Sequence, residues 1–213
     1  MNDKLINTLF LDIGGVLLTN GWDTDERNAA IEHFKLNGKE MEERHNLSFR
    51  NYEIGKWTLG EYLNEIVFYE PRSFTPKQFE MFMFKQSVAF QDTIDYFIEV
   101  KKQYNLKVIA LSNEGRELNA YRIKKFKLGE LFDTFIVSSF VHLRKPDPGI
   151  FRMAIDIAQA EPQHSLYIDD RLVFVKVAKS LGMHAIHHST IEETMTQVKL
   201  VEFFEHSIVQ PDY

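Results

Sequence analysis

Short apolar runs recur along the chain and alternate with segments of helical periodicity. Several runs are apolar at consecutive positions, which is the pattern of parallel strands that helices bury on both faces. Their lengths, four to six residues, suit strands better than helices. We predict five strands, at Thr8–Ile13, Lys107–Leu111, Thr134–Val137, Ser165–Ile168 and His184–His187.

The segments between the later strands carry local signals of helices. Asp147-Pro148 combines a helix N-cap with a proline at the first helical position. Residues 172–181 are apolar at helical spacing, and the glycine that follows them ends the pattern. Thr190 and Glu193 have the spacing of a capping box. Because strand and helix alternate, the sequence predicts a doubly wound α/β sheet.

The interval between the first two strands is too long for a single crossover helix. It contains several helix starts and no strand-like alternation, so it predicts a helical insertion after the first strand. We place the insertion at residues 19–91 and the sheet domain at residues 1–18 and 92–213. The helix starts are Asp23 with Glu26, Thr58 with Glu61, and Thr75-Pro76 with Gln78.

Composition narrows the class of protein. The chain has 213 residues, enough for one substantial domain with an insertion, and it contains no cysteine. A cysteine-free chain fits a reducing cytoplasm, so we expect a soluble cytoplasmic protein. The net charge of −6 disfavours nucleic acid and anionic membrane as partners. Asp3 and Lys4 precede a short apolar run that ends in Asp12, which is neither a signal peptide nor a membrane span.

Polar residues gather where the predicted strands end. Asp12 follows the first strand, Ser112-Asn113 the second, Lys145 the third and Asp169-Asp170 the fourth. In an open parallel sheet, ligands bind at the carboxyl ends of the strands, near the point where the strand order reverses. We therefore expect these residues to meet in one crevice.

The charges of this group predict a metal ion. Asp12, Asp169 and Asp170 bring three negative charges, and Lys145 brings one positive charge. Such an excess in a partly dry crevice requires protons or a divalent cation. Oxygen ligands without His or Cys suit Mg²⁺. With Mg²⁺ in place, the site becomes nearly neutral and can accept a phosphate group.

The catalytic roles follow from the same residue types. Asp12 is placed to attack phosphorus and form an aspartyl-phosphate, and Lys145 to neutralise charge on the transferred group. Ser112 and Asn113 precede a predicted helix and can hold phosphoryl oxygens. Gly14 and Gly15 leave room for a phosphate to approach the backbone.

The four segments, taken in order, resemble the motifs of the haloacid dehalogenase (HAD) superfamily over most of the chain. The segments are Asp12-Ile-Gly-Gly, Ser112-Asn, Lys145-Pro-Asp-Pro and Asp169-Asp170. The resemblance implies a Rossmann-like core, a cap formed by the helical insertion, and Mg²⁺-dependent hydrolysis of phosphate esters. The stretch DIGGVLL is similar to small sugar-phosphate phosphatases of the type that acts on glucose 1-phosphate.

Two positions depart from the family pattern. The family's second aspartate, which protonates the leaving group and then activates water, is Gly14 here. In the family that position also gives its backbone carbonyl to the metal, so the implied metal ligands are Asp12, Gly14, Asp169 and Asp170. General acid–base help is worth ~10² to 10⁴ in rate. Asp23 and Asp25 are nearby acids that could replace it. The second departure is Phe174, where the family usually has a polar residue.

We expect a Mg²⁺-dependent hydrolase of small phosphate monoesters, including sugar phosphates, that works through an aspartyl-phosphate on Asp12. Its partner is a small phosphorylated metabolite, and the sequence leaves the oligomeric state open. One alternative is a metal-free 2-haloacid dehalogenase, which also lacks the second aspartate but gains nothing from an acidic pair. The other is a non-catalytic relative that binds a phosphorylated ligand, which the change at Gly14 favours.

Overall fold

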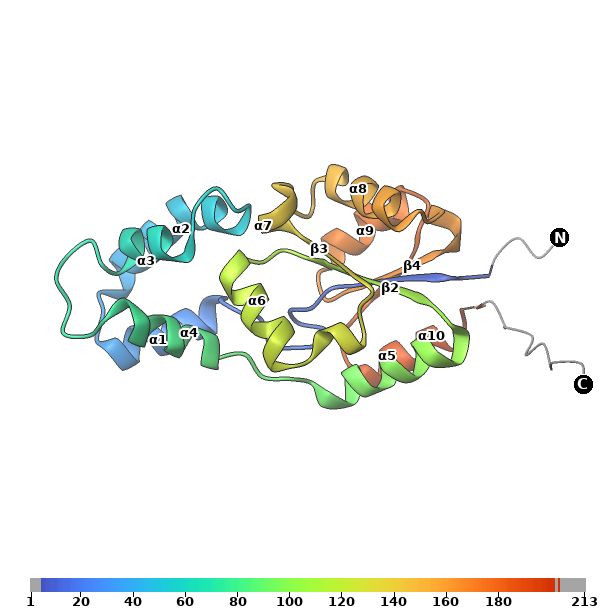
Figure 1. The fold of residues 1–213 in the computed structure, drawn as a ribbon, viewed down its shortest axis with the longest axis horizontal. Helices are drawn as coiled ribbons and strands as arrows, with labels where there is room; N and C mark the ends of the chain where they lie inside the picture. Colours follow the sequence, from blue (N-terminus) through green and yellow to red (C-terminus); the bar gives the residue numbers. More distant parts are fainter. Residues whose placement is uncertain (1–4, 202, 204–213) are drawn as a thin grey trace, which may run out of the picture.

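Five parallel strands form one sheet in the order β3-β2-β1-β4-β5 (Figure 1). The computed structural model describes residues 5–201 and 203. It confirms all five predicted strands, with small shifts at their ends: β1 stops before Asp12, whereas β2 and β4 run one residue further than expected. The strands are β1 Thr8–Leu11, β2 Lys107–Ser112, β3 Thr134–Val137, β4 Ser165–Asp169 and β5 His184–His187.

The strand order reverses at β1, which pairs with β2 on one side and β4 on the other. Leu11, the last residue of β1, lies opposite Ala110 and Ile168. The backbone N–H of Asp12 then donates to the Ile168 carbonyl at 3.0 Å. This hydrogen bond places Asp12 at the reversal point, where doubly wound sheets bind their ligands.

Helices cover both faces of the sheet. In Figure 1, α8 and α9 lie on one face, and α5 and α10 lie on the other. Successive strand residues point to opposite faces, so Phe10 packs with the α8–α9 cluster while Leu9 and Leu11 pack with the α5 cluster. The elements are α5 Gln91–Tyr104, α6 Arg116–Lys125, η1 Leu128–Glu130, α7 Ser138–Val141, α8 Pro148–Ala158, η2 Pro162–His164, α9 Leu172–Ser180 and α10 Ile191–Val198.

The predicted helix starts in this part are confirmed with one correction. The Asp147 side chain accepts from the Gly149 N–H at 2.8 Å, and Pro148 is the first helical residue of α8. Thr190 caps α10 by accepting from the Glu193 N–H. The Glu193 side chain does not bond back to the Thr190 N–H, as a capping box requires. Its carboxylate accepts a hydrogen bond from the Ser189 hydroxyl instead.

The predicted helical insertion forms a separate group, which we call the cap (Figure 1). Its helices pack around a core that contains Trp22, Tyr62 and Phe79. The two segments that join the cap to the sheet pair with each other through an antiparallel bridge between Leu18 and Ala89. The exact boundaries at residues 18–19 and 91–92 stay a prediction. The helices are α1 Thr24–Phe34, α2 Gly38–Glu53, α3 Leu59–Ile66 and α4 Pro76–Lys85, and the three predicted capping boxes open α1, α3 and α4.

The C-terminal end of α2 contacts α7 of the sheet domain. The Ser138 hydroxyl donates to the Glu53 carbonyl at 2.6 Å, and the His142 Nδ1 lies 2.8 Å from the Ile54 carbonyl. Gly55 has a φ of +70°, and a Cβ added there would lie 2.0 Å from the Ser139 carbonyl oxygen. Only glycine allows this approach of the two backbones.

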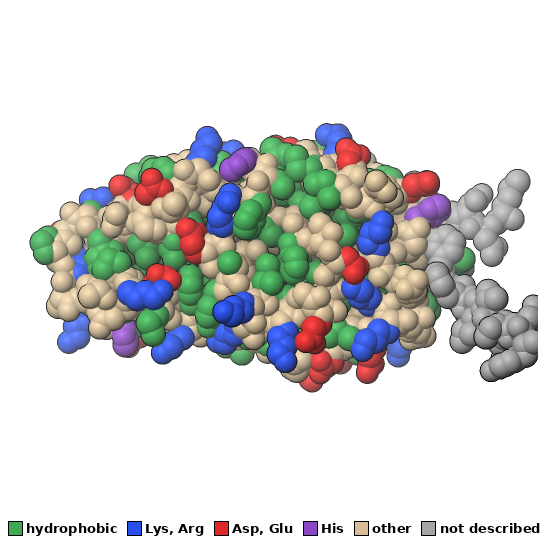
Figure 2. Space-filling view, viewed as in Figure 1, with side chains coloured by type: hydrophobic (Ala, Val, Ile, Leu, Met, Phe, Trp, Pro, Cys, Tyr) green, Lys and Arg blue, Asp and Glu red, His purple; other side chains and the backbone are tan. Residues whose placement is uncertain are grey.

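The surface in Figure 2 carries acidic and basic side chains interspersed, and neither sign forms a continuous patch on this face. The face shown therefore has no extended basic surface of the kind that binds a nucleic-acid backbone. Among the described residues, no helix has both the length and the apolar character needed to cross a bilayer.

We predict that Gly55→Ala lowers the free energy of unfolding by at least ~1–2 kcal/mol, the penalty of an L-residue in the left-handed region, because the Ser139 carbonyl must also move. Gly129→Ala is the matched control, since a Cβ at Gly129 meets nothing within 4 Å. Urea unfolding of both variants measures the difference. Equal stabilities would contradict the close approach of the cap to α7.

Candidate active site

Lys145 joins two of the predicted acids at the carboxyl end of the sheet. Its side chain is fully buried, and its Nζ lies 3.1 Å from Asp12 Oδ2 and 2.6 Å from Asp169 Oδ2. Phe174, the position at which the family pattern has a polar residue, places its ring centroid 5.0 Å from the same ammonium. The apolar ring therefore contacts the cation through its π face.

Both carboxylate oxygens of Asp169 already have hydrogen-bond donors. Oδ2 accepts from Lys145 and from the Tyr167 hydroxyl, and Oδ1 accepts from the Arg171 N–H at 2.8 Å. We did not predict the role of Tyr167. The signal for it was its spacing, because residues two apart on a strand point to the same face. Of the three acidic residues, Asp169 thus accepts the most hydrogen bonds from the rest of the described protein.

Asp170 completes the acidic group. One carboxylate oxygen from each of Asp12, Asp169 and Asp170 lies within 4.8 Å of the others. Asp170 Oδ1 is buried and has no hydrogen-bond partner among the described residues. Gly15, with a φ of +75°, makes room for this carboxylate, since a Cβ there would lie 2.3 Å from Asp170 Oδ2. A buried carboxylate oxygen without a donor in such a group fits a cation ligand.

The electrostatics of the group follow from burial and crowding. Burial and the neighbouring Asp169 and Asp170 raise the pKa of Asp12 to about 6, although Lys145 opposes the shift. Burial and Asp169 also raise the pKa of Asp170. Burial disfavours the charged form of Lys145, but Asp12 and Asp169 outweigh it, so the pKa of Lys145 is raised. One ammonium does not balance three carboxylates, and the group retains an affinity for protons or a cation.

The remaining predicted residues lie around this group in different ways. The Gly14 carbonyl accepts no hydrogen bond from any described residue, and the Ser112 hydroxyl likewise has no described partner. The Asn113 carboxamide, which we expected to hold phosphoryl oxygens, instead bonds the Lys145 backbone twice, at 2.9 and 2.8 Å. Asn113 therefore positions Lys145.

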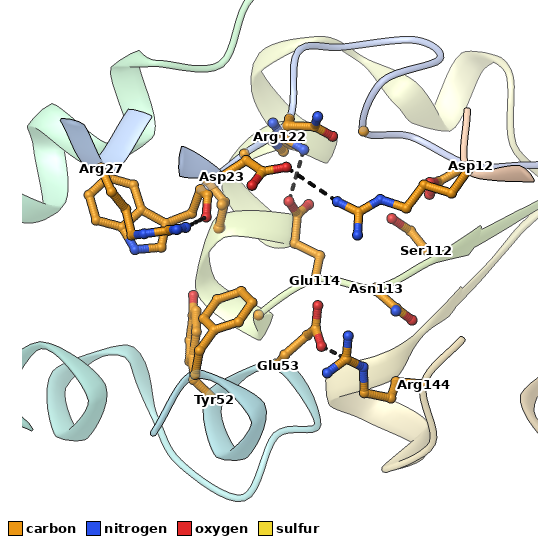
Figure 3. Close-up of a pocket in the computed structure, with 18 of the residues that line it drawn as sticks. Asp12, Asp23, Arg27, Tyr52, Glu53, Ser112, Asn113, Glu114, Arg122 and Arg144 are labelled. Carbon is orange, nitrogen blue, oxygen red and sulfur yellow. Dashed lines mark hydrogen bonds and ion pairs between the residues drawn. The ribbon is translucent and has the colours of Figure 1, made fainter. Parts of the chain in front are cut away.

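A cavity of about 190 Å³ opens between this group and the cap. In Figure 3, Asp12 and Ser112 lie on the sheet side of the cavity, and Tyr52 and Arg27 lie on the cap side. Two ion pairs cross between the two parts. Glu53 pairs with Arg144 at 2.8 Å (Figure 3), and Asp23 pairs with Arg171 at 3.2 Å. The cap is therefore in contact with the sheet domain on both sides of the cavity.

Of the two nearby acids that could replace the missing aspartate, Asp23 borders the cavity and Asp25 does not. Asp23 pairs with Arg171 and also caps α1, where its side chain accepts from the Thr24 N–H at 2.8 Å. Asp25 lies exposed in the first turn of α1, and it is not among the residues that line the cavity.

A hydrogen-bonded chain of cap residues reaches the same cavity. The Trp22 Nε1–H donates to the Tyr62 hydroxyl at 2.9 Å, and that hydroxyl lies 2.7 Å from His45 Nδ1. Burial lowers the pKa of His45 to about 4, with Arg27 adding to the shift. His45 is therefore a neutral imidazole near pH 7, and it borders the cavity from the cap side.

An ion pair that the sequence did not reveal lies at the back of the cavity. Arg122 Nη1 donates to Glu114 Oε1 at 2.8 Å, and both side chains are buried. Arg122 also donates to the Thr19 carbonyl at 2.6 Å and to the Ser87 hydroxyl at 2.9 Å. Its helix is strongly polar, so the sequence pattern alone predicts a solvated side chain at this position.

The strand reversal of the parallel sheet and the lysine-bridged group of aspartates beside it agree with the fold class that the sequence predicts. The haloacid dehalogenase-like hydrolase family matches residues 6–182. The chain belongs to this family.

Curated relatives match the chain over part of their own length. A drimenol cyclase of Aspergillus calidoustus is 24% identical over 197 residues, which is 91% of this chain and 36% of the relative. A glyceraldehyde 3-phosphate phosphatase of Pyrococcus abyssi is 29% identical over 84 residues, 39% of this chain and 34% of the relative. The chain thus spans little more than a third of either protein.

Solved structures match more completely. A HAD family enzyme from Bacteroides thetaiotaomicron, in complex with magnesium and inorganic phosphate, is 25% identical with a TM-score of 0.73, covering 86% of this chain and 94% of the other. A HAD-like family hydrolase from Porphyromonas gingivalis is 20% identical with a TM-score of 0.74, covering 92% and 97%. These matches confirm the predicted fold class.

We predict that Arg122→Met lowers the free energy of unfolding by about 3–5 kcal/mol, because it leaves Glu114 as an unpaired buried charge. The double variant Glu114→Gln/Arg122→Met should lose less free energy of unfolding than Arg122→Met alone, since no uncompensated charge remains. Urea unfolding measures both. With Glu114→Gln measured as the second single variant, a double variant as unstable as the sum of the two single changes would show that the pair is not coupled.

Proposed function

We propose that this protein hydrolyses small phosphate monoesters through an aspartyl-phosphate on Asp12. The observation that carries the proposal is the position of the Asp12 carboxylate. It lies at the strand reversal, 3.1 Å from a buried ammonium, and it borders a cavity closed by the cap. A carboxylate held in this way is a suitable nucleophile for phosphoryl transfer.

In the first step, an Asp12 oxygen attacks phosphorus, the bond from phosphorus to the ester oxygen breaks, and its electron pair stays on that oxygen. The leaving group departs as a phenolate, or as an alkoxide that takes a proton from water. Lys145 lies beside Asp12 and neutralises negative charge that the phosphoryl group brings. The Ser112 hydroxyl, which has no described partner, donates to a phosphoryl oxygen. In the second step, water attacks phosphorus and the bond from phosphorus to Asp12 breaks.

The donor set fits Mg²⁺. Asp12, the partnerless Asp170 Oδ1 and the free Gly14 carbonyl are hard oxygen ligands, and Asp169 supports them through its contact with Lys145. When bound, Mg²⁺ supplies charge that screens the repulsion between the carboxylates and a phosphate dianion. The magnesium and phosphate complex of the Bacteroides enzyme supports this assignment.

The cavity favours a small substrate. Its volume of about 190 Å³ lies below the ~300–1,000 Å³ of typical ligand pockets, so a small phosphorylated metabolite, such as a sugar phosphate, suits it. Metal-free dehalogenation is disfavoured. The acidic group of Asp12, Asp169 and Asp170 fits a divalent cation, which a metal-free reaction does not use.

We predict that the protein hydrolyses an aryl phosphate in the presence of Mg²⁺ and that Asp12→Asn or a chelator abolishes this activity. An aryl leaving group departs without protonation, so the assay does not depend on the acid that is missing at Gly14. Release of phenolate at pH 7 is the measurement. Activity that survives both treatments would overturn the mechanism, and metal-dependent binding of phosphate without turnover would favour a non-catalytic role.

We also predict that Mg²⁺ raises the melting temperature of the wild-type protein and that Asp170→Asn loses most of this shift. A ligand present at about 100 times its Kd stabilises the folded state by ~2.7 kcal/mol. In chelator, Asp170→Asn should be at least as stable as the wild type, because one crowded carboxylate is gone. Asp156→Asn, which removes an exposed carboxylate on α8, is the control and should keep the full shift.

A further inference from the structure

The space beside Gly14 is occupied by Asn20. A Cβ built on Gly14 would point at the Asn20 side chain, with Oδ1 at 3.2 Å, and would have Arg122 Nη1 at 3.9 Å. Asn20 and Asp12 border the same cavity. The carboxamide oxygen therefore lies close to the place that an acid at position 14 would fill.

The Asn20 side chain is free, whereas the backbone before it is fixed. No described residue makes a hydrogen bond to the Asn20 carboxamide. The preceding Thr19 is held at three groups: its N–H donates to the Val88 carbonyl at 2.9 Å, its carbonyl accepts from Arg122 at 2.6 Å, and its hydroxyl donates to the Gln86 carbonyl at 3.1 Å. The carboxamide therefore keeps its hydrogen-bonding groups available for a small polar molecule, next to a backbone that Thr19 holds in place.

The two acids near this position each share an ion pair with an arginine, although Glu114 Oε2 is buried without a hydrogen-bond partner among the described residues. Glu114 is bonded to Arg122, and Asp23 is bonded to Arg171. Asn20 is thus the residue whose side chain lies nearest to a Cβ built at position 14, and its carboxamide has no hydrogen-bond partner among the described residues.

We propose that the Asn20 carboxamide orients the water that hydrolyses the phosphorylated form of Asp12. The inference rests on the proposed function, because it assigns a residue to the second half of that reaction. An amide does not take a proton, but its oxygen accepts a hydrogen bond from water and so directs the water oxygen at phosphorus. Glutamine plays such a water-positioning role in other phosphoryl-transfer enzymes.

The step balances without a general base on the protein. The water oxygen bonds to phosphorus, the bond from phosphorus to the Asp12 oxygen breaks, and that electron pair returns to the Asp12 carboxylate. The water proton passes to a phosphoryl oxygen, and the products are the free carboxylate and dihydrogen phosphate.

Pre-steady-state release of phenolate from an aryl phosphate separates the two halves of the reaction. In Asn20→Ala, we expect a burst of about one phenolate per site at a rate within about twofold of the first turnover of the wild type. The steady-state rate should fall by about tenfold or more, since misplacing a reactant by about 1 Å can cost ~10²-fold in rate. A burst and a steady-state rate that fall together, or that both stay unchanged, would overturn the inference.

Two further variants keep the test specific. Asn20→Asp retains the size and the accepting oxygen and can also take up the water proton, so its steady-state rate should equal or exceed that of the wild type. Asn64→Ala makes the same truncation on the exposed side of α3 and should change neither phase. If Asn20→Asp is as slow as Asn20→Ala, the inference is wrong. If the wild type itself releases no phenolate with Mg²⁺, the proposed function fails and this inference fails with it.

Discussion

The contact between the buried Lys145 ammonium and the Asp12 and Asp169 carboxylates is the constraint on which the site depends. A fully buried ammonium is stable only when it is paired, and removing one partner of such a pair costs about 3–5 kcal/mol. Neighbouring side chains hold the groups that make this contact. Asn113 holds the Lys145 backbone, and Tyr167 donates to the same Asp169 oxygen that Lys145 contacts. Asp12, the proposed nucleophile, is therefore positioned by the core of the sheet.

The same contact leaves the acidic group incompletely neutralised. Among the residues that the structure describes, Asp170 Oδ1 is buried without a donor and the Gly14 carbonyl accepts no hydrogen bond, so two oxygens lie unpaired in a region of excess negative charge. This combination favours a cation, and a cation in turn favours a phosphate. The cap closes over the same region through Glu53 and Arg144, which pair across the boundary between the two parts. The excess negative charge that the fold gathers at the strand ends is therefore the basis of the proposed metal binding and phosphate chemistry.

The sequence predicted the fold and the members of the site, because both depend on local patterns. Buried parallel strands have continuous apolar runs, and topology alone brings their ends together, so Asp12 and Lys145 could be placed beside each other from sequence. Contacts that depend on how one element packs against another could not be predicted from the sequence. Arg122 sits on a polar helix yet is buried against Glu114, and Asn20 fills the space at Gly14 only because the chain turns back after β1.

The most direct test of the account is to locate the phosphoryl group during turnover. The wild-type protein is mixed with Mg²⁺ and an aryl phosphate, quenched in acid within the first turnover, digested and mapped by mass spectrometry. The account predicts a single phosphoryl group on Asp12, in the peptide that follows β1, and its disappearance once the substrate is exhausted. Turnover without a modified Asp12, or a phosphoryl group on another residue, would contradict it.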